Sequence, residues 1–272
     1  MRRRPNWRNI VFLTLALLLI ALSIFFLVRP GGNEDRICHG INVLICDTLN
    51  EHFLFEQDIR SHIQKKYPKI IGMQKRDINT AELEKILATD PFIRKAECYI
   101  APSGNLSVKI WQRLPILRVF GNIEPISDIA DSIHHHTNTS HSDYYVDEEG
   151  RCFPTSKRYN AQVVIVTGNV SRTFVCEKLV PLVRLIRADA FLKDEIQQID
   201  VSSDEELTLI PTYGDHQIVF GKADNYAEKL AKLKLFYEKG LNVIGWGRYE
   251  SINIDYENQV VCTKKETGDK GR

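Results

Sequence analysis

The stretch NTAELEKILATDPFIRKAECYIAPSGNLSVKIWQR (residues 79–113) changes the spacing of its apolar residues midway. Up to Pro91 they recur every three or four positions, and Asn79 is suited to cap a helix whereas Pro91 cannot continue one. After Pro91 they alternate with polar residues in two runs, and Pro102 and Gly104 separate the runs. The stretch therefore predicts a helix followed by a β-hairpin.

The residues before this stretch complete a small module. Residues 37–46 form an apolar, strand-like run. Phe55, Ile59 and Ile63 recur every four positions, as they would on one face of a helix. The predicted order is β-α-α-β-β over residues 37–113.

A second, larger block follows at residues 114–262. It mixes short strand-like runs with helical stretches at 173–192 and 224–240. Asp224 is placed to cap the second helix, and Gly240 is placed to end it. We therefore predict an α+β fold class, in which the second domain is mostly antiparallel.

The block closes with ESINIDYENQVVC (residues 250–262), where Ile252, Ile254 and Tyr256 alternate with polar residues. This alternation predicts a last, half-buried strand with these three side chains on one face, and the run can extend further through Val260. A last strand has no later strand to pair with, so it is a candidate for the edge of a sheet. An exposed edge needs a cover, because it invites pairing with other chains.

The N-terminus holds an apolar run, residues 10–28, without charge, glycine or proline. As a helix the run spans about 28 Å, close to the thickness of a bilayer core. Four basic residues precede it: Arg2, Arg3, Arg4 and Arg8. The positive-inside rule then predicts a single-pass, type II membrane protein with residues 1–9 in the cytoplasm. The alternative is a cleaved signal peptide, but the run exceeds a usual signal core and no small-residue cleavage site follows. The remaining segments are a linker at 29–36 and a charged C-terminal tail at 263–272.

The charge balance argues against nucleic acid as a partner. The 272 residues include 36 Lys and Arg and 35 Asp and Glu. Without the four N-terminal arginines, 32 basic residues face 35 acidic ones, so the rest of the chain has no basic surplus for phosphates.

No catalytic constellation stands out. The sequence contains no P-loop, G-x-S-x-G, G-x-G-x-x-G or H-E-x-x-H motif. The acidic DEEG (residues 147–150) lies between two strand-like runs, which predicts a turn. The histidines at 134, 135, 136 and 141 lie in a polar, aperiodic stretch, which predicts a solvated loop more than a metal site. We expect no enzymatic activity, no catalytic residue, no metal and no cofactor.

The six cysteines form no C-x-x-C pair. Outside the cytoplasm disulfides are permitted, and buried free thiols fit the scatter of the six residues at least as well. Cys38 and Cys46 are the pair to test first.

The order of these parts resembles a known family. The capped helix, Pro-Phe-Ile, Ala-Glu, turn, strand and Gln-Arg-x-Pro of residues 79–115 closely resemble the polypeptide-transport-associated (POTRA) domain of the bacterial cell division protein family FtsQ/DivIB. YYVDEEGRCFP, VVIVTGN, IVFGKADNYAEKLAKLKLFY and the closing INIDYENQVV are similar to the family's second, β domain. The basic tail and single apolar run also fit, so the resemblance covers nearly the whole chain.

The resemblance implies a bitopic protein of the cell inner membrane, with a POTRA domain at 37–113 and a β domain at 114–262 outside the cytoplasm. It implies a non-enzymatic role in septum formation, through protein–protein interaction within the divisome. The partners it implies are the coiled-coil division proteins FtsB and FtsL, in a network with FtsW, FtsI, FtsK and FtsN.

The resemblance also implies where a partner binds. In the family, FtsB adds a strand to the last strand of the β domain, and the family's contact tyrosine falls on Tyr256 here. The neighbours that this predicts for the contact are Ile252, Ile254, Asp255, Glu257, Asn258 and Val260. Where the family often has an arginine, this chain has Asp255. The charge that the partner must match would then differ.

Two other classes of protein compete with this interpretation. A POTRA-containing secretion or outer-membrane assembly component usually repeats the module or adds a β-barrel, and neither pattern occurs in the sequence. An anchored envelope enzyme would need the histidine-rich stretch to hold a metal ion.

Overall fold

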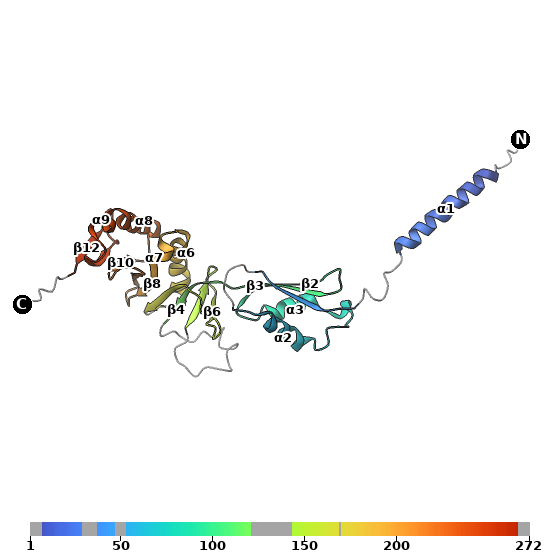
Figure 1. The fold of residues 1–272 in the computed structure, drawn as a ribbon, viewed down its shortest axis with the longest axis horizontal. Coiled ribbons are helices and arrows are strands. Elements are labelled where there is room, and N and C mark those ends of the chain that lie inside the picture. Colours follow the sequence, from blue (N-terminus) through green and yellow to red (C-terminus); the bar gives the residue numbers. More distant parts are fainter. Residues whose placement is uncertain (1–6, 29–36, 47–52, 121–142, 169, 266–272) are drawn as a thin grey trace, which may run out of the picture.

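The computed structural model describes residues 7–28, 37–46, 53–120, 143–168 and 170–265 (Figure 1). The side chains of residues 8–10 and 26–28 are not described. Arg2, Arg3, Arg4 and the four loop histidines lie outside the described residues, as does the side chain of Arg8.

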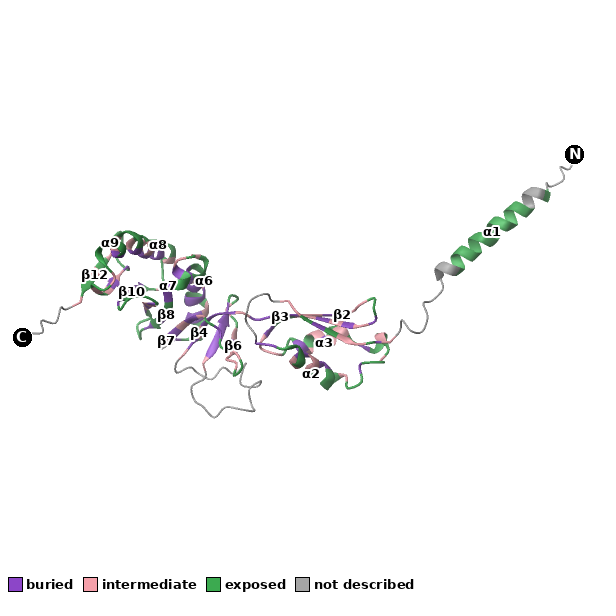
Figure 2. Ribbon diagram, in the orientation of Figure 1, coloured by how far each residue is buried: buried purple, intermediate pink, exposed green. Residues whose placement is uncertain are grey.

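The first helix, α1 (Trp7–Val28), contains the whole predicted apolar run. Every side chain described from Val11 to Phe25 is exposed, and Figure 2 shows this part of the helix in the colour for exposed residues. Among the residues that the structure describes, none of the helices combines the length and the apolar character that a membrane crossing requires.

The first domain is built on a three-stranded sheet in the order β1-β3-β2. Strand β1 runs parallel to β3, and β2 pairs with β3 as the antiparallel hairpin that the sequence predicts. The bounds of its elements are β1 (Ile41–Ile45), α2 (Glu56–Lys66), the 3₁₀ turn η2 (Lys75–Asp77), α3 (Thr80–Leu87), β2 (Ile93–Ile100) and β3 (Leu106–Gln112). The order β-α-α-β-β is therefore confirmed.

The cap of α3 is also confirmed. The side-chain oxygen of Asn79 accepts a hydrogen bond from the backbone N–H of Glu82 at 3.1 Å. The carboxylate of Glu82 does not return a bond to Asn79, as a full capping box would require, but pairs with the ammonium of Lys66 on α2. The pair joins the two helices on one side of the sheet.

The second domain contains a nine-stranded sheet in the order β12-β11-β10-β9-β8-β7-β4-β5-β6. Five of its eight neighbouring pairs are antiparallel, and the pairs β4·β7, β7·β8 and β10·β11 are parallel. Its strands are β4 (Pro115–Val119), β5 (Tyr144–Asp147), β6 (Cys152–Pro154), β7 (Val164–Gly168), β8 (Ile196–Val201), β9 (Glu206–Pro211), β10 (Gln217–Lys222), β11 (Tyr249–Asn253) and β12 (Val261–Lys264).

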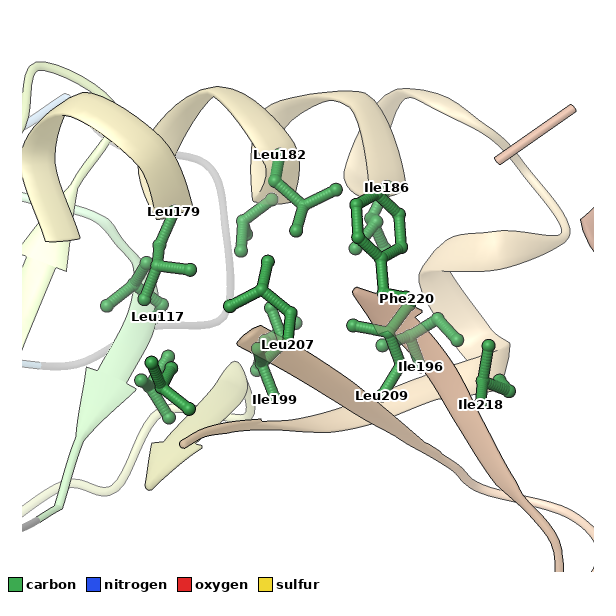
Figure 3. Packing of buried hydrophobic residues seen from close by; sticks show 14 of the residues in the cluster. Leu117, Leu179, Leu182, Ile186, Ile196, Ile199, Leu207, Leu209, Ile218 and Phe220 are labelled. Carbon is green, nitrogen blue, oxygen red and sulfur yellow. The ribbon is translucent and has the colours of Figure 1, made fainter. Parts of the chain in front are cut away.

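Helices cover one face of this sheet. They are α5 (Arg172–Phe174), the π-helical turn η3 (Val175–Leu179), α6 (Val180–Ala188), α7 (Leu192–Glu195), α8 (Tyr226–Phe236), the π-helical turn η4 (Tyr237–Leu241) and α9 (Asn242–Ile244). Figure 3 shows Leu182 and Ile186 of α6 directed toward Ile199, Leu207 and Phe220 of the strands. All five side chains are fully buried, so this contact forms the centre of the core.

The second predicted helix of this domain ends later than its sequence indicates. Gly240 lies inside η4, and the helical path continues to Ile244 before Gly245 turns the chain with φ +102°. Asp224 does not cap the helix start, since no side-chain cap bond occurs there and its carboxylate pairs with Lys229 instead. The contact with the buried Lys229 thus overrides the tendency of Asp224 to cap the helix.

All six cysteines are free, so the proposed pair Cys38–Cys46 is not bridged. Burial raises the pKa of the Cys98 thiol to about 12 and that of Cys152 to about 11. These thiols stay protonated near neutral pH and are poor nucleophiles.

An aromatic cluster joins the two domains. Phe53 and Phe92 of the first domain stack with ring centroids 5.6 Å apart. Phe53 also meets the rings of Tyr145, Phe153 and Tyr159 of the second domain edge-on, at 5.7, 6.2 and 5.0 Å. Aromatic pairs at such distances add stabilisation beyond the area that they bury.

A buried ion pair lies beside this cluster. The guanidinium of Arg113, just after β3, donates to the carboxylate of Asp147 at the end of β5, and both side chains are less than one-tenth exposed. Asp147 also accepts hydrogen bonds from the backbone N–H groups of Glu149 and Arg151, at 2.9 and 2.8 Å. The predicted DEEG turn is thus confirmed, and its first carboxylate holds the turn and the domain junction together.

Asp147→Ala should destabilise the protein by about 3–5 kcal/mol, because it leaves the Arg113 guanidinium buried without its partner. The free energy of unfolding in urea would measure this loss. Glu149→Ala, in the same turn, is the matched control. Its pair with Arg151 is exposed and 4.0 Å long, so its loss should cost less than about 1 kcal/mol. Equal effects of the two variants would contradict a structural role for the buried pair.

Candidate partner-binding edge

The closing residues form a hairpin and not the single strand that the alternation predicts. Strand β11 ends at Asn253, and the chain then turns and returns as β12, antiparallel to β11. The predicted open edge is therefore displaced. Strand β11 has β10 on one side and β12 on the other, and β12 is the strand at the end of the sheet.

One backbone hydrogen bond shows which residues of β12 face outward. The N–H of Lys265 donates to the carbonyl of Arg248, just before β11, at 3.0 Å. Successive residues of a strand direct their N–H and C=O groups to opposite sides. Thr263 therefore faces β11, and Cys262 and Lys264 direct their backbone groups to the open side. Nothing pairs with that side among the described strands.

The predicted contact residues separate into two groups. Ile252 and Ile254 are fully buried in the core of the domain, so their side chains cannot touch a partner. The backbone N–H of Ile254 donates to the carbonyl of Val219 on β10 at 3.0 Å. Tyr256 lies beyond the end of β11 and its side chain is 51% exposed. The prediction that these three side chains share one face is wrong, because the strand stops before Tyr256.

The turn between the strands carries the other predicted residues. Glu257 and Asn258 are exposed, Asn258 has φ +56°, and Val260 is half-buried against the core. The carbonyl oxygen of Tyr256 accepts a hydrogen bond from the ammonium of Lys232 on α8. The turn is thus attached to the helix through its backbone, which leaves the tyrosine ring outside.

Asp255 binds a lysine of its own domain, although its side chain is 42% exposed. Its carboxylate accepts a hydrogen bond from Lys229 of α8 at 2.6 Å, and Lys229 also donates to the carboxylate of Asp224 and to the carbonyl of Lys222, at 2.8 and 2.9 Å. The ammonium lies 4.9 Å from the centre of the Phe220 ring, and the lysine is only 4% exposed. The carboxylate that was predicted to face a partner protein thus pairs with a lysine of the same chain.

Burial alone would lower the pKa of Lys229, but the hydrogen bonds and charges of Asp224 and Asp255 outweigh it and raise the pKa above the usual value. The lysine is therefore charged in the folded protein. A buried ammonium between two carboxylates ties α8 to the start of the hairpin turn.

Gly221 makes room for this contact. It has φ +73° and lies at an irregularity of β10, and a Cβ placed on it would come within 2.2 Å of the carboxyl carbon of Asp255. A Cβ at this position would therefore force the Asp255 carboxylate or the backbone of β10 to shift.

The opposite end of the sheet is a poorer docking edge. Strand β6 has three residues and contains Pro154, which cannot donate to a further strand. Its Phe153 is buried in the aromatic cluster between the domains. Among the two edges of the described sheet, β12 is the one without proline.

The sequence reasoning missed Cys262 and Lys264, whose backbone groups face the open side. The available signal was the polar run Glu257–Gln259, which interrupts the alternation and is typical of a turn. The strand-like Val260–Cys262 after this run then predicts a second strand.

The described residues offer no group of three or more His, Cys, Asp or Glu side chains that could hold a metal ion. The histidine-rich stretch that raised this question lies outside the described residues.

Comparison with protein families matches two models to the chain. A POTRA-like domain model matches residues 36–111, and a model described as FtsQ/DivIB, C-terminal related, matches residues 134–263. The second match includes β11, the turn and most of β12. No curated protein matches the chain.

Gly221→Ala should cost about 3 kcal/mol in the free energy of unfolding, because it adds the displacement of Asp255 to the strain of a positive φ. Gly72→Ala is the matched control. Gly72 has φ +85° with nothing within 4 Å of an added Cβ, so only the backbone strain of about 1 kcal/mol applies. Urea unfolding measures both variants. In an Asp255→Ala background the two glycine variants should cost the same, and a persisting difference would contradict the contact with Asp255.

Proposed function

Because the chain belongs to the FtsQ/DivIB family of bacterial cell division proteins, we propose that it is a non-enzymatic, membrane-anchored scaffold of the divisome. In this proposal it binds FtsB- and FtsL-type coiled-coil proteins at the division septum. Through them it joins a network that includes FtsW, FtsI, FtsK and FtsN.

The observation that carries the proposal is the open side of β12. A partner strand that adds there would find the backbone groups of Cys262 and Lys264, which no other described strand bonds. In strand addition the main-chain hydrogen bonds supply affinity, and the exposed side chains supply specificity. Next to this edge are two exposed apolar side chains, Val261 and Tyr256.

The rigid attachment of the turn supports the same role. Lys229 of α8 bonds the carboxylate of Asp255, and Lys232 of α8 bonds the backbone carbonyl of Tyr256. A preformed edge loses little conformational entropy when a partner binds, which favours affinity.

The anchoring part of the proposal rests on the sequence. In the sequence, residues 10–28 are an uncharged apolar run, and Arg2, Arg3, Arg4 and Arg8 precede them, which is the pattern that motivates the proposed anchor. In the proposed arrangement the protein is single-pass type II in the inner membrane, with its N-terminus in the cytoplasm and its bulk in the periplasm. Confinement to one plane raises the effective concentration of other membrane proteins, so each contact can be weak.

The POTRA-like domain comes first after the anchor, and we assign to it the contacts with membrane-proximal division proteins. The alternative of a POTRA-containing secretion component is less well supported. The FtsQ/DivIB model covers residues 134–263, and a secretion component would not need this domain.

Lys264→Pro should abolish binding of an FtsB-type peptide while leaving the stability of the protein nearly unchanged. Proline removes an N–H that faces the open side, where edge strands tolerate it. A pull-down with the peptide, together with thermal unfolding, measures both properties.

Thr263→Pro is the matched control for this experiment. It removes an N–H that faces β11, so it should lower the melting temperature by several degrees. Undiminished binding by a folded Lys264→Pro variant would refute strand addition at β12.

Depletion of the protein should give filamentous cells, because septation then fails. Wild-type protein and Leu185→Ala should restore division, whereas Tyr256→Ala should restore it only weakly. Both side chains are about half exposed, at 42% and 51%, but Leu185 lies on α6, away from the hairpin. Cell length under the microscope is the readout, and full rescue by Tyr256→Ala would remove the ring from the proposed contact.

A further inference from the structure

A cavity of about 500 Å³ opens at the end of the second domain where α7, the turn from β9 to β10 and the segment after α9 meet. It is lined by Ala190, Phe191, Asp194, Glu195, Tyr213 and Trp246. These residues take no part in the partner-binding edge described above.

Two buried polar groups in and beside this cavity lack partners. Glu195 lines the cavity, is 4% exposed, and its Oε1 has no hydrogen-bond partner among the described residues. His216 is 2% exposed, and its Nε2 lies 2.7 Å from the hydroxyl of Tyr237, whereas its Nδ1 has no partner. An unsatisfied buried polar group costs free energy, and such a group in a native structure points to a missing ligand or water.

The rings around these groups form a continuous aromatic wall. The ring centroid of Trp246 is 5.2 Å from that of Tyr237 and 6.4 Å from that of His216, and Phe191 meets Tyr237 edge-on at 5.9 Å. Three aromatic side chains line the cavity itself: Phe191, Tyr213 and Trp246.

The charges at the cavity all have one sign. Asp194 and Glu195 contribute carboxylates, and the described lining residues include no basic side chain. Aromatic faces attract cations through the ring quadrupole, and the attraction grows when the cation is desolvated. A cation held between these rings would lie next to the carboxylates of Asp194 and Glu195.

We propose that this cavity binds an alkylammonium group, with the ammonium on the Glu195 carboxylate and the alkyl chain against Phe191, Tyr213 and Trp246. An alkylammonium combines an apolar chain with hydrogen-bond donors that satisfy the carboxylate. The group could be supplied by a lysine side chain of another protein or by a free amine. The site is independent of the proposed function.

The protonation of Glu195 determines how the proposed binding depends on pH. Burial raises the pKa of Glu195 to about 7. The titratable groups near Glu195 are Asp194 on α7 and Tyr237 on η4. Near His216, which precedes β10, are Asp215 and Lys265, which pair at 3.2 Å. Burial lowers the pKa of His216, so this histidine stays neutral around pH 7 and does not supply the missing cation.

The test uses the full-length protein in detergent and two probes of the same size, n-butylammonium and 1-butanol. The indole N–H signal of Trp246 reports binding in ¹H–¹⁵N spectra, and that of Trp111, in the first domain, is the internal reference. At pH 8 butylammonium should shift the Trp246 signal in a saturable manner. Butanol at the same concentrations should shift it at least tenfold less.

The affinity for butylammonium should fall about tenfold from pH 8 to pH 6, because Glu195 is then protonated. Glu195→Gln should bind at least tenfold more weakly at pH 8 and show no such pH dependence. Glu206→Gln, an exposed position at the start of β9, is the matched control and should bind like wild type. Equal binding of butanol and butylammonium, or unchanged affinity of Glu195→Gln, would overturn the proposal.

A stability measurement shows that the variant is folded. The raised pKa of Glu195 means that the folded state holds its proton more tightly than the unfolded state, so the contribution of this group to stability falls as the pH rises from about 4.5 to about 7. Glu195→Gln should therefore be more stable than wild type at pH 8.

A comparison of butylammonium with an acetylated lysine amide separates the two sources of the alkylammonium group. Tighter binding of the lysine derivative indicates a protein side chain, and tighter binding of butylammonium indicates a free amine.

Discussion

The ammonium of Lys229, buried between the carboxylates of Asp224 and Asp255, determines where the C-terminal hairpin lies. Strand β11 runs parallel to β10, so the chain must cross over through α8 before it can pair. Lys229 lies on that helix. It contacts Asp224, shortly before the helix, and Asp255, shortly after β11. The same contact needs Gly221, because a Cβ at this position would force the Asp255 carboxylate or the backbone of β10 to shift.

The hairpin gives the sheet an asymmetric pair of edges. At one end a short strand ends in Pro154 and packs into the aromatic cluster between the domains. At the other end β12 directs the backbone groups of Cys262 and Lys264 outward. A sheet that closes one edge and leaves the other open can add a strand in one place only, which suits a scaffold with a defined partner.

Buried charges serve different purposes in the two halves of the second domain. Arg113 and Asp147 satisfy each other at the domain junction, and the turn after β5 depends on the same carboxylate. The Oε1 of Glu195 has no such partner among the described residues, and Glu195 lies on a cavity with aromatic walls. A satisfied pair maintains a fixed junction, whereas an unsatisfied carboxylate is available to a ligand.

The sequence by itself determined the local elements, because their causes are local. The cap at Asn79, the stop before Pro91 and the DEEG turn all depend on neighbouring residues, and the family resemblance followed from the order of such elements. Only the tertiary structure decided which strand forms the edge, that Asp255 faces Lys229 and that Ile254 is buried while Tyr256 is exposed. These facts depend on contacts between residues far apart in the chain, and the alternation of side chains within one strand carries no information about them.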